Sequence, residues 1–146
     1  ARVFRLIEQR DKLREKFSNE PGIVRSAMCT TDRDKEFADR LAAILEQNLA
    51  RPEFSIDEFA QLMKLGRTVF YRKLRGVTGY SPNEYLRVVR MKKAAELLLS
   101  EDNLTVAEVS YKVGISDPFY FSKCFKAQFG VAPSVYQRGV NNEIES

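Results

Sequence analysis

The stretch "SDPFYFSKCFKAQFG", residues 116–130, decides the fold because it has the spacing and the end signal of one short helix. Phe121, Phe125 and Phe129 recur at every fourth position, which predicts that they form one buried face. Gly130 follows the last of them, where a glycine commonly ends a helix. The residues between the three rings are therefore predicted to lie on the outer faces of this helix.

The pattern around this stretch occurs twice in the chain. Residues 55–79 and 105–130 each contain a short capped helix, a glycine turn and a second helix, followed by glycine. The two copies align at an offset of 50 before the turn and 51 after it, so the second turn is one residue longer. The matched pairs are Ser55/Thr105, Glu58/Glu108, Ala60/Ser110, Phe70/Phe121, Arg72/Lys123, Leu74/Phe125, Gly79/Gly130, Pro82/Pro133 and Tyr85/Tyr136. We therefore expect two helix-turn-helix units.

Helical spacing and capping signals also predict the elements around these units, and no segment alternates long enough to predict a strand. Ser81 and Glu84 form a capping box, with Pro82 at the first position of the longest helix. The predicted helices are 3–17, 33–49, 55–63, 67–77, 82–99, 105–113, 117–130 and a final short helix from 132 past 136. The expected fold is all-α, with two helix-turn-helix subdomains joined by a long linker helix and preceded by an N-terminal amphipathic helix.

The residue types argue against an enzyme. The chain has no histidine, and its two cysteines, Cys29 and Cys124, lie far apart without a CxxC motif. We expect both to be reduced thiols of a cytoplasmic protein. No catalytic residues, no metal ligands and no cofactor are predicted. Nothing in the chain has the apolar length of a membrane span or of a secretory signal.

Charge is distributed unevenly along the chain. The net charge is only +4, but residues 64–93 contain nine Lys or Arg and a single acid, Glu84. A local basic field of this kind favours a polyanionic partner. Two alternatives remain open at this point: a solvated helix face, and a basic protein-interaction module that binds an acidic partner.

Residues 55–137 resemble the DNA-binding domain of AraC/XylS-type bacterial transcription regulators, above all in "VGISDPFYFSKCFKAQFGVAPSVY", residues 113–136. The resemblance implies a seven-helix domain that activates transcription by binding double-stranded promoter DNA, with RNA polymerase as a further partner. Two residues depart from the family pattern. Ser110 replaces the usual alanine, and Gly66 replaces the serine that usually caps the first reading helix. Because glycine can also cap a helix, we expect the fold to tolerate this change.

The segment "RDKLREKFSNEPG", residues 10–22, looks like the junction of the hybrid two-component regulators of Bacteroidetes. That resemblance implies an upstream receiver and a membrane sensor for carbohydrates, while this part of the protein makes no direct membrane contact. The expected divisions are a linker (1–31), the DNA-binding domain (32–138) and a C-terminal tail (139–146). A homodimer formed through the N-terminal helix or the upstream domains is expected. The alternatives are a soluble response regulator and a free-standing AraC-type activator.

The resemblance places the first reading helix at 67–77, where Val69, Phe70 and Leu74 are predicted to face the core. The predicted DNA-binding residues on its other faces are Arg67, Thr68, Tyr71, Arg72 and Arg75. Arginine can bind the O6 and N7 atoms of guanine with two hydrogen bonds. Arg72 is therefore the principal candidate for reading a base, with Thr68 and Tyr71 in support. The other two arginines are assigned to phosphate.

The second reading helix, 117–129, supplies the matching residues at an offset of 51. The predicted DNA-binding residues are Pro118, Phe119, Ser122, Lys123 and Lys126. Lys126 is assigned to phosphate. Phe119 has two alternatives: an exposed ring could pack on thymine methyl groups, or the ring could fold back against the domain. Tyr120 is predicted to pack partly under the turn, with its hydroxyl reaching a polar partner.

Four cations of the long helix, Arg87, Arg90, Lys92 and Lys93, are further candidates for phosphate contact or for ordinary exposed charge. Arg90 has a third alternative, a structural role that connects the two units.

Overall fold

The computed structural model describes residues 31–145 of the chain, with side chains described for residues 31–139. The predicted helix 3–17 and Cys29 lie outside the described residues. The described part is all-helical, without a strand, as the sequence predicts. Its helices are α2 (Asp32–Asn48), α3 (Ile56–Leu62), α4 (Arg67–Thr78), α5 (Pro82–Leu98), α6 (Val106–Lys112), α7 (Pro118–Phe129) and α8 (Pro133–Glu145).

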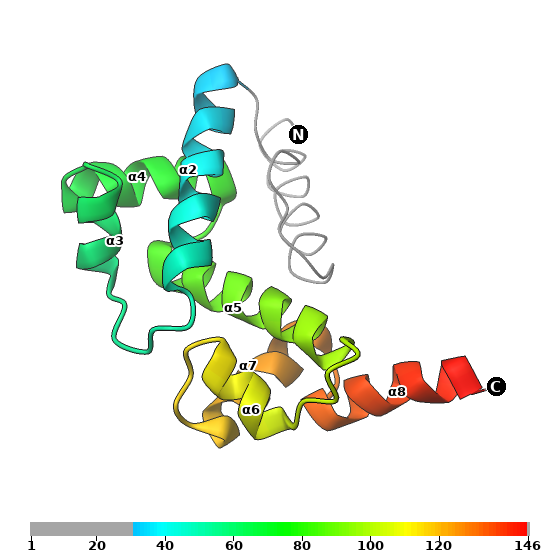
Figure 1. Ribbon diagram of the computed structural model, residues 1–146. Coiled ribbons are helices and arrows are strands. Elements are labelled where there is room, and N and C mark those ends of the chain that lie inside the picture. The colour runs from blue at the N-terminus through cyan, green and yellow to red at the C-terminus, as the bar shows by residue number, and fades with distance from the viewer. Residues whose placement is uncertain (1–30, 146) are drawn as a thin grey trace.

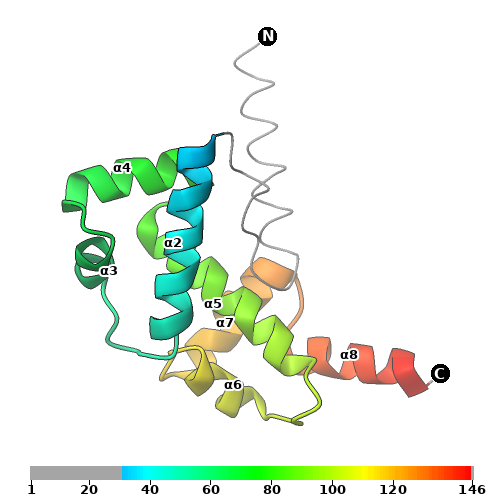
Figure 2. The ribbon, with the colours of Figure 1, turned by 45° about the horizontal axis from the view of Figure 1, so that its top comes forward.

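The long helix α5 runs between two groups of helices (Figures 1 and 2). Helices α2, α3 and α4 form the group at one end of α5, and α6 and α7 form the group at the other. Helix α8 begins beside the second group and extends away from it. It is longer than the short helix expected from the sequence, and it contains Gly139 without ending there.

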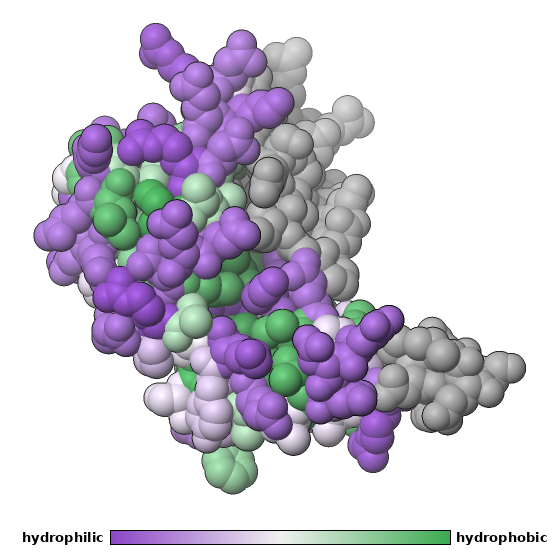
Figure 3. Space-filling view, viewed as in Figure 1, coloured by the Kyte–Doolittle hydropathy of each residue, from purple (hydrophilic) through white to green (hydrophobic). Residues whose placement is uncertain are grey.

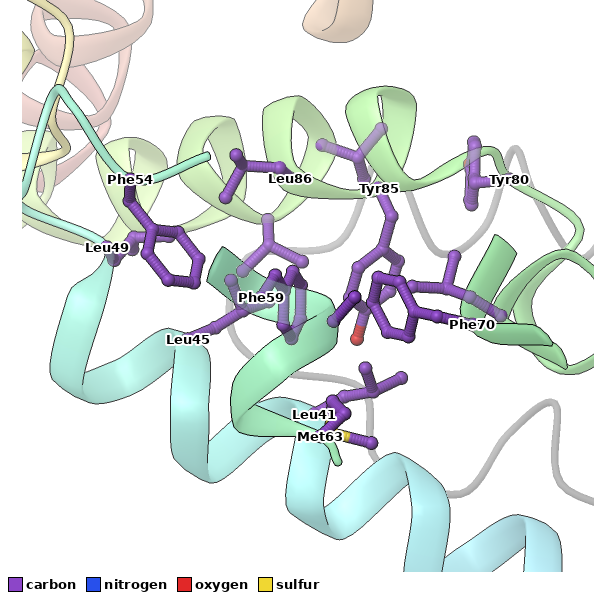
Figure 4. Packing of buried hydrophobic residues seen from close by; sticks show 14 of the residues in the cluster. Leu41, Leu45, Leu49, Phe54, Phe59, Met63, Phe70, Tyr80, Tyr85 and Leu86 are labelled. Carbon is purple, nitrogen blue, oxygen red and sulfur yellow. The ribbon is translucent and has the colours of Figure 1, made fainter. Parts of the chain in front are cut away.

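The first core fills the space between α2, α3, α4 and α5 (Figure 4). Leu41 and Leu45 from α2 point toward Phe59 of α3 and Phe70 of α4. The rings of Phe59 and Phe70 lie 5.0 Å apart between centroids, in a tilted arrangement that aromatic pairs favour. This packing fixes the orientation of α4 against the rest of the unit.

The second core lies between α5, α6, α7 and the start of α8. Phe121 and Phe125 are completely buried, and Phe129 is partly buried against them. The ring of Tyr136, from α8, meets Phe125 edge-on with 5.3 Å between centroids. The predicted buried face of three phenylalanines is therefore confirmed. It fixes the orientation of α7 in the second unit, just as the first core fixes the orientation of α4.

Side chains begin the helices where the sequence predicts caps. The hydroxyls of Ser55, Ser81 and Thr105 accept hydrogen bonds from the backbone N–H groups of the residues three positions on, at 3.1, 3.3 and 3.1 Å. Each bond satisfies a donor that the first turn of a helix leaves unpaired. Gly79 and Gly130 end α4 and α7 with φ of 78° and 84°, a left-handed conformation that glycine adopts at little cost.

Arg90 has a structural role, which is one of the alternatives that the sequence left open for it. It lies on α5, and its Nη2 donates a hydrogen bond to the carbonyl oxygen of Arg51, 2.9 Å away. Its side chain also lies against Gly114, in the turn of the second unit. The same turn is closed by Ser110, whose buried hydroxyl donates to the carbonyl oxygen of Ile115 at 2.7 Å. Arg90 therefore connects the segment between α2 and α3, the linker helix and the turn of the second unit.

Candidate nucleic-acid interface

Helix α4 presents one continuous exposed stripe, made by the residues that the sequence assigned to DNA. Its members are Arg67, Thr68, Tyr71, Arg72 and Arg75, and all five are exposed. Their spacing of i, i+1, i+4, i+5 and i+8 places them on adjacent rows of the helix surface. We call this set the α4 stripe.

The opposite face of α4 is held by the core. Phe70 and Leu74 are fully buried, as predicted. Val69 is 50% exposed, so its predicted place in the core is wrong. The buried face follows a spacing of four residues from Phe70, and Val69 falls beside it. The ammonium group of Lys73 lies 4.8 Å from the centroid of the Phe37 ring on α2, so this lysine points toward α2 and away from the stripe.

The first turn of α4 is suited to an anion. Gly66 is its N-cap, and no side chain caps the N–H groups of that turn. Arg67 forms an ion pair with Asp57 of α3, with Nε and Oδ1 3.6 Å apart and both side chains mostly exposed. An exposed pair of this kind contributes at most about 1 kcal/mol. Arg67 can therefore exchange this carboxylate for a phosphate at little cost.

Helix α7 presents the matching stripe at an offset of 51. Its members are Pro118, Phe119, Ser122, Lys123 and Lys126, and we call them the α7 stripe. Phe119, Lys123 and Lys126 are exposed, and the two others are partly buried. The Phe119 ring is 88% exposed. This excludes the alternative in which the ring folds back against the domain. Asp117 caps this helix by accepting a hydrogen bond from the Phe119 N–H at 3.0 Å.

Tyr120 lies beside the α7 stripe, with its hydroxyl near Arg87 of the linker helix. Tyr120 is 51% exposed, which agrees with the partial packing that the sequence predicts, and its hydroxyl has polar partners. A hydrogen bond with the Cys124 thiol raises the pKa of the Tyr120 hydroxyl, and a hydrogen bond with Arg87 of α5 opposes that shift. Arg87 thus lies near the Tyr120 hydroxyl while it stays exposed.

The other cations of α5 divide into two kinds. Lys93 is exposed and pairs with Glu96 at 3.4 Å. Lys92 is only 1% exposed, so it is wrong as a candidate for phosphate contact. It belongs to the lining of an apolar cavity of about 140 Å³ between α2 and α5. No residue of α4 or α7 lines that cavity, which is therefore separate from both stripes.

The described residues contain no group of three or more His, Cys, Asp or Glu side chains that could hold a metal ion. None of the helices in the described range is long and apolar enough to cross a membrane. Hydrophilic residues cover most of the face shown in Figure 3, where α2, α3 and α4 lie, with small hydrophobic areas between them.

A family model described as a helix-turn-helix domain matches residues 59–139, which include both stripes. Histidine kinase P4 of Formosa agariphila is 35% identical over 143 residues, which cover 98% of this chain. The chain spans only 10% of the length of that kinase.

Two solved structures share the fold. One is the C-terminal domain of AraT, a response regulator from Geobacillus stearothermophilus, with 30% identity and a TM-score of 0.63 over 69% of this chain and 83% of that one. The other is the DNA-binding domain of AdpA, a global transcriptional factor, in complex with a target DNA. It is 25% identical, with a TM-score of 0.65 over 72% of this chain and 93% of that one.

Proposed function

Since this chain belongs to the AraC-type family of helix-turn-helix transcription regulators, we propose that its two stripes are the surfaces that read DNA. Domains of this family bind DNA, and the AdpA complex is an example. In this proposal α4 and α7 enter two successive segments of the major groove from one monomer. The linker helix α5 sets their relative placement.

The observation that carries the proposal is the agreement between the two stripes. The five positions of the α4 stripe and the five of the α7 stripe are related by one offset, and each stripe lies opposite a buried, mainly apolar face. Packing alone requires only the buried faces to agree. Matched exposed stripes on both second helices are what two groove-reading helices need.

Within the α4 stripe, Arg72 is proposed to read a base. It lies near the middle of the exposed row, and its guanidinium can donate two hydrogen bonds to guanine, which discriminates against other bases by about 1–3 kcal/mol. Thr68 and Tyr71 support it. Arg67 and Arg75, one at each end of the stripe, are proposed to bind phosphate and so fix the register of the helix.

Within the α7 stripe, Lys123 occupies the position of Arg72 and is proposed to donate to a base edge. Ser122 and Pro118 lie beside it on the same surface. Lys126 corresponds to Arg75 and is proposed to bind phosphate. Arg87 is a further phosphate candidate because it is exposed and lies near the Tyr120 hydroxyl of α7.

We propose that the DNA-binding domain spans residues 32–138, with 1–31 as the linker from an upstream receiver and 139–146 as a C-terminal segment. The similarity to a histidine kinase and to the C-terminal domain of a response regulator supports a place in a two-component phosphorelay. The resemblance of residues 10–22 favours a hybrid sensor that controls genes for carbohydrate use. A soluble response regulator and a free-standing activator are the alternatives.

In the hybrid architecture, phosphorylation of the receiver would pair two chains through the N-terminal helix or the upstream domains. Two DNA-binding domains would then occupy adjacent sites and present themselves to RNA polymerase. The DNA-binding part would work in the cytoplasm even where the sensor is anchored in the inner membrane.

The experiment that tests the proposal is selection of bound sequences from a random duplex pool, followed by affinity measurements on selected and scrambled duplexes. Arg72→Ala and Lys123→Ala should lower the preference for the selected duplex. Lys35→Ala, on the exposed surface of α2, is the matched control and should leave it unchanged. The sequence also left open a basic protein-interaction module. Such a module would bind both duplexes weakly and equally.

A further inference from the structure

Phe119 is unlike every other member of the two stripes. Its ring is 88% exposed, the greatest exposed fraction among the large hydrophobic side chains of residues 31–139. Exposed apolar surface is unfavourable in water, and burial against another apolar group recovers that free energy. The ring is therefore an apolar contact without a partner inside the described part of the chain.

The local structure keeps the ring in this position. Asp117 accepts a hydrogen bond from the Phe119 N–H, and Pro118 occupies the first position of the helix, so the start of α7 is well defined. The residues one turn further along the same face, Ser122 and Lys123, leave the ring 88% exposed. The ring consequently projects from the helix start.

The two stripes differ in their chemistry at matched positions. The α4 stripe carries three arginines, whereas α7 contains no arginine anywhere from Pro118 to Phe129. Phe119 stands where the α4 stripe has Thr68. Arginine suits guanine, whereas in the major groove an apolar side chain suits the methyl group that only thymine carries among the four bases.

We propose that Phe119 reads thymine by packing its ring on the 5-methyl group, in the segment of the operator that faces α7. Recognition of guanine by arginine is then confined to the segment that faces α4. The operator is therefore asymmetric, with the guanine in the segment facing α4 and the thymine in the segment facing α7. This inference rests on the proposed function, because it assigns a base to one of the two proposed reading helices.

Charge around the ring favours DNA over a protein partner. Lys123 and Lys126 follow it on the same stripe, and Asp117, the nearest acid in the sequence, is engaged as the helix cap. Charged side chains are depleted from the centres of protein interfaces. A single exposed ring at the start of a stripe that also carries two lysines is instead suited to a polyanion with methyl groups in its groove.

The test replaces each thymine of the selected operator, one at a time, with deoxyuridine, which keeps the base pair and removes only the methyl group. Dissociation constants are then measured for the unaltered protein and for Phe119→Ala. We expect one position in the segment facing α7 to weaken binding of the unaltered protein roughly fourfold. Phe119→Ala should bind the thymine operator more weakly and lose all discrimination between thymine and deoxyuridine at that position.

Two further variants serve as controls. Phe119→Leu keeps an apolar side chain and should retain the preference for thymine. Val135→Ala removes another exposed apolar side chain, on α8, and should leave the deoxyuridine profile of the unaltered protein in place. Thermal unfolding of Phe119→Ala should match that of the unaltered protein, because the ring is exposed.

Two results would overturn the inference. In the first, no deoxyuridine in the segment facing α7 weakens binding of the unaltered protein. In the second, deoxyuridine there weakens binding of Phe119→Ala as much as binding of the unaltered protein. In either case the selected duplex would still be preferred over the scrambled one, and the proposed function would stand. A protein that binds both duplexes equally would instead contradict the proposed function itself.

Discussion

The guanidinium group of Arg90 lies so close to Gly114 that a Cβ atom at position 114 would come within 3.0 Å of Nη2. The same Nη2 donates a hydrogen bond to the carbonyl oxygen of Arg51. The carbonyl oxygen of Leu49, at the end of α2, also lies in the space that such a Cβ would occupy. The end of α2, the linker helix and the second helix-turn-helix unit therefore meet at a crowded junction, which contributes to the relative placement of α4 and α7.

Gly114→Ala should destabilise the protein. Gly114 has a φ of +82°, which L-residues rarely adopt, and the added methyl group would overlap the Leu49 carbonyl and the Arg90 side chain. Strain of this kind typically costs about 1–3 kcal/mol. Urea denaturation followed by circular dichroism measures the free energy of unfolding.

The matched control is Gly76→Ala. Gly76 lies inside α4 and has nothing within 4 Å of the position where its Cβ would be. Because alanine is a better helix former than glycine, this variant should gain about 0.5–1 kcal/mol. Equal effects of the two substitutions would contradict the close approach at the junction.

Arg90→Ala should lower the free energy of unfolding by about 1.5–3 kcal/mol, because it removes a charged donor and leaves the Arg51 carbonyl without that hydrogen bond. Lys93→Ala, three positions along the same helix, breaks only an exposed ion pair with Glu96 and should change stability by about 0.5 kcal/mol or less. If the two variants were equally stable, Arg90 would not connect the units.

Two phenylalanines on α7 should behave oppositely. Phe121→Ala removes a fully buried ring and should cost about 3–5 kcal/mol in stability. Phe119→Ala removes an exposed ring and should change stability by about 0.5 kcal/mol or less. Thermal unfolding of both variants, beside the unaltered protein, distinguishes the core face from the outer face. A large loss of stability for Phe119→Ala would show that its ring is packed.

The sequence predicts most of this fold because its helix ends carry strong local signals. The hydroxyls of Ser55, Ser81 and Thr105 cap helices at the expected residues, and the described helices begin and end within two residues of most predicted limits. Helix α8 is the exception. Its length could not be predicted because no proline or strong capping signal marks its end.

Burial of individual side chains is less predictable, because it depends on the neighbouring helices. Val69 is apolar but falls outside the buried face of α4, where no other helix among the described residues covers it. Lys92 is charged but buried, although lysine is usually exposed. The comparison of the two units identified the stripes, since both lie opposite strongly apolar faces. Only the structure decided between the two alternatives for Phe119.

Phosphate contacts should be visible in the salt dependence of binding. Arg75→Ala and Lys126→Ala should each weaken binding to selected and scrambled duplexes alike, and should reduce the slope of log K against log salt concentration by about 0.9. Titrations at several salt concentrations measure this slope. A slope that stays the same in both variants would contradict their assignment to phosphate.

The central claim, that two matched stripes read DNA sequence, is tested most directly by the ratio of affinities for the selected and the scrambled duplex at one fixed salt concentration. The account predicts that Arg72→Ala lowers this ratio roughly 5- to 150-fold, the discrimination expected of one bidentate base contact. It also predicts a reduction for Lys123→Ala and none for Lys35→Ala. An unchanged ratio in both Arg72→Ala and Lys123→Ala would contradict it.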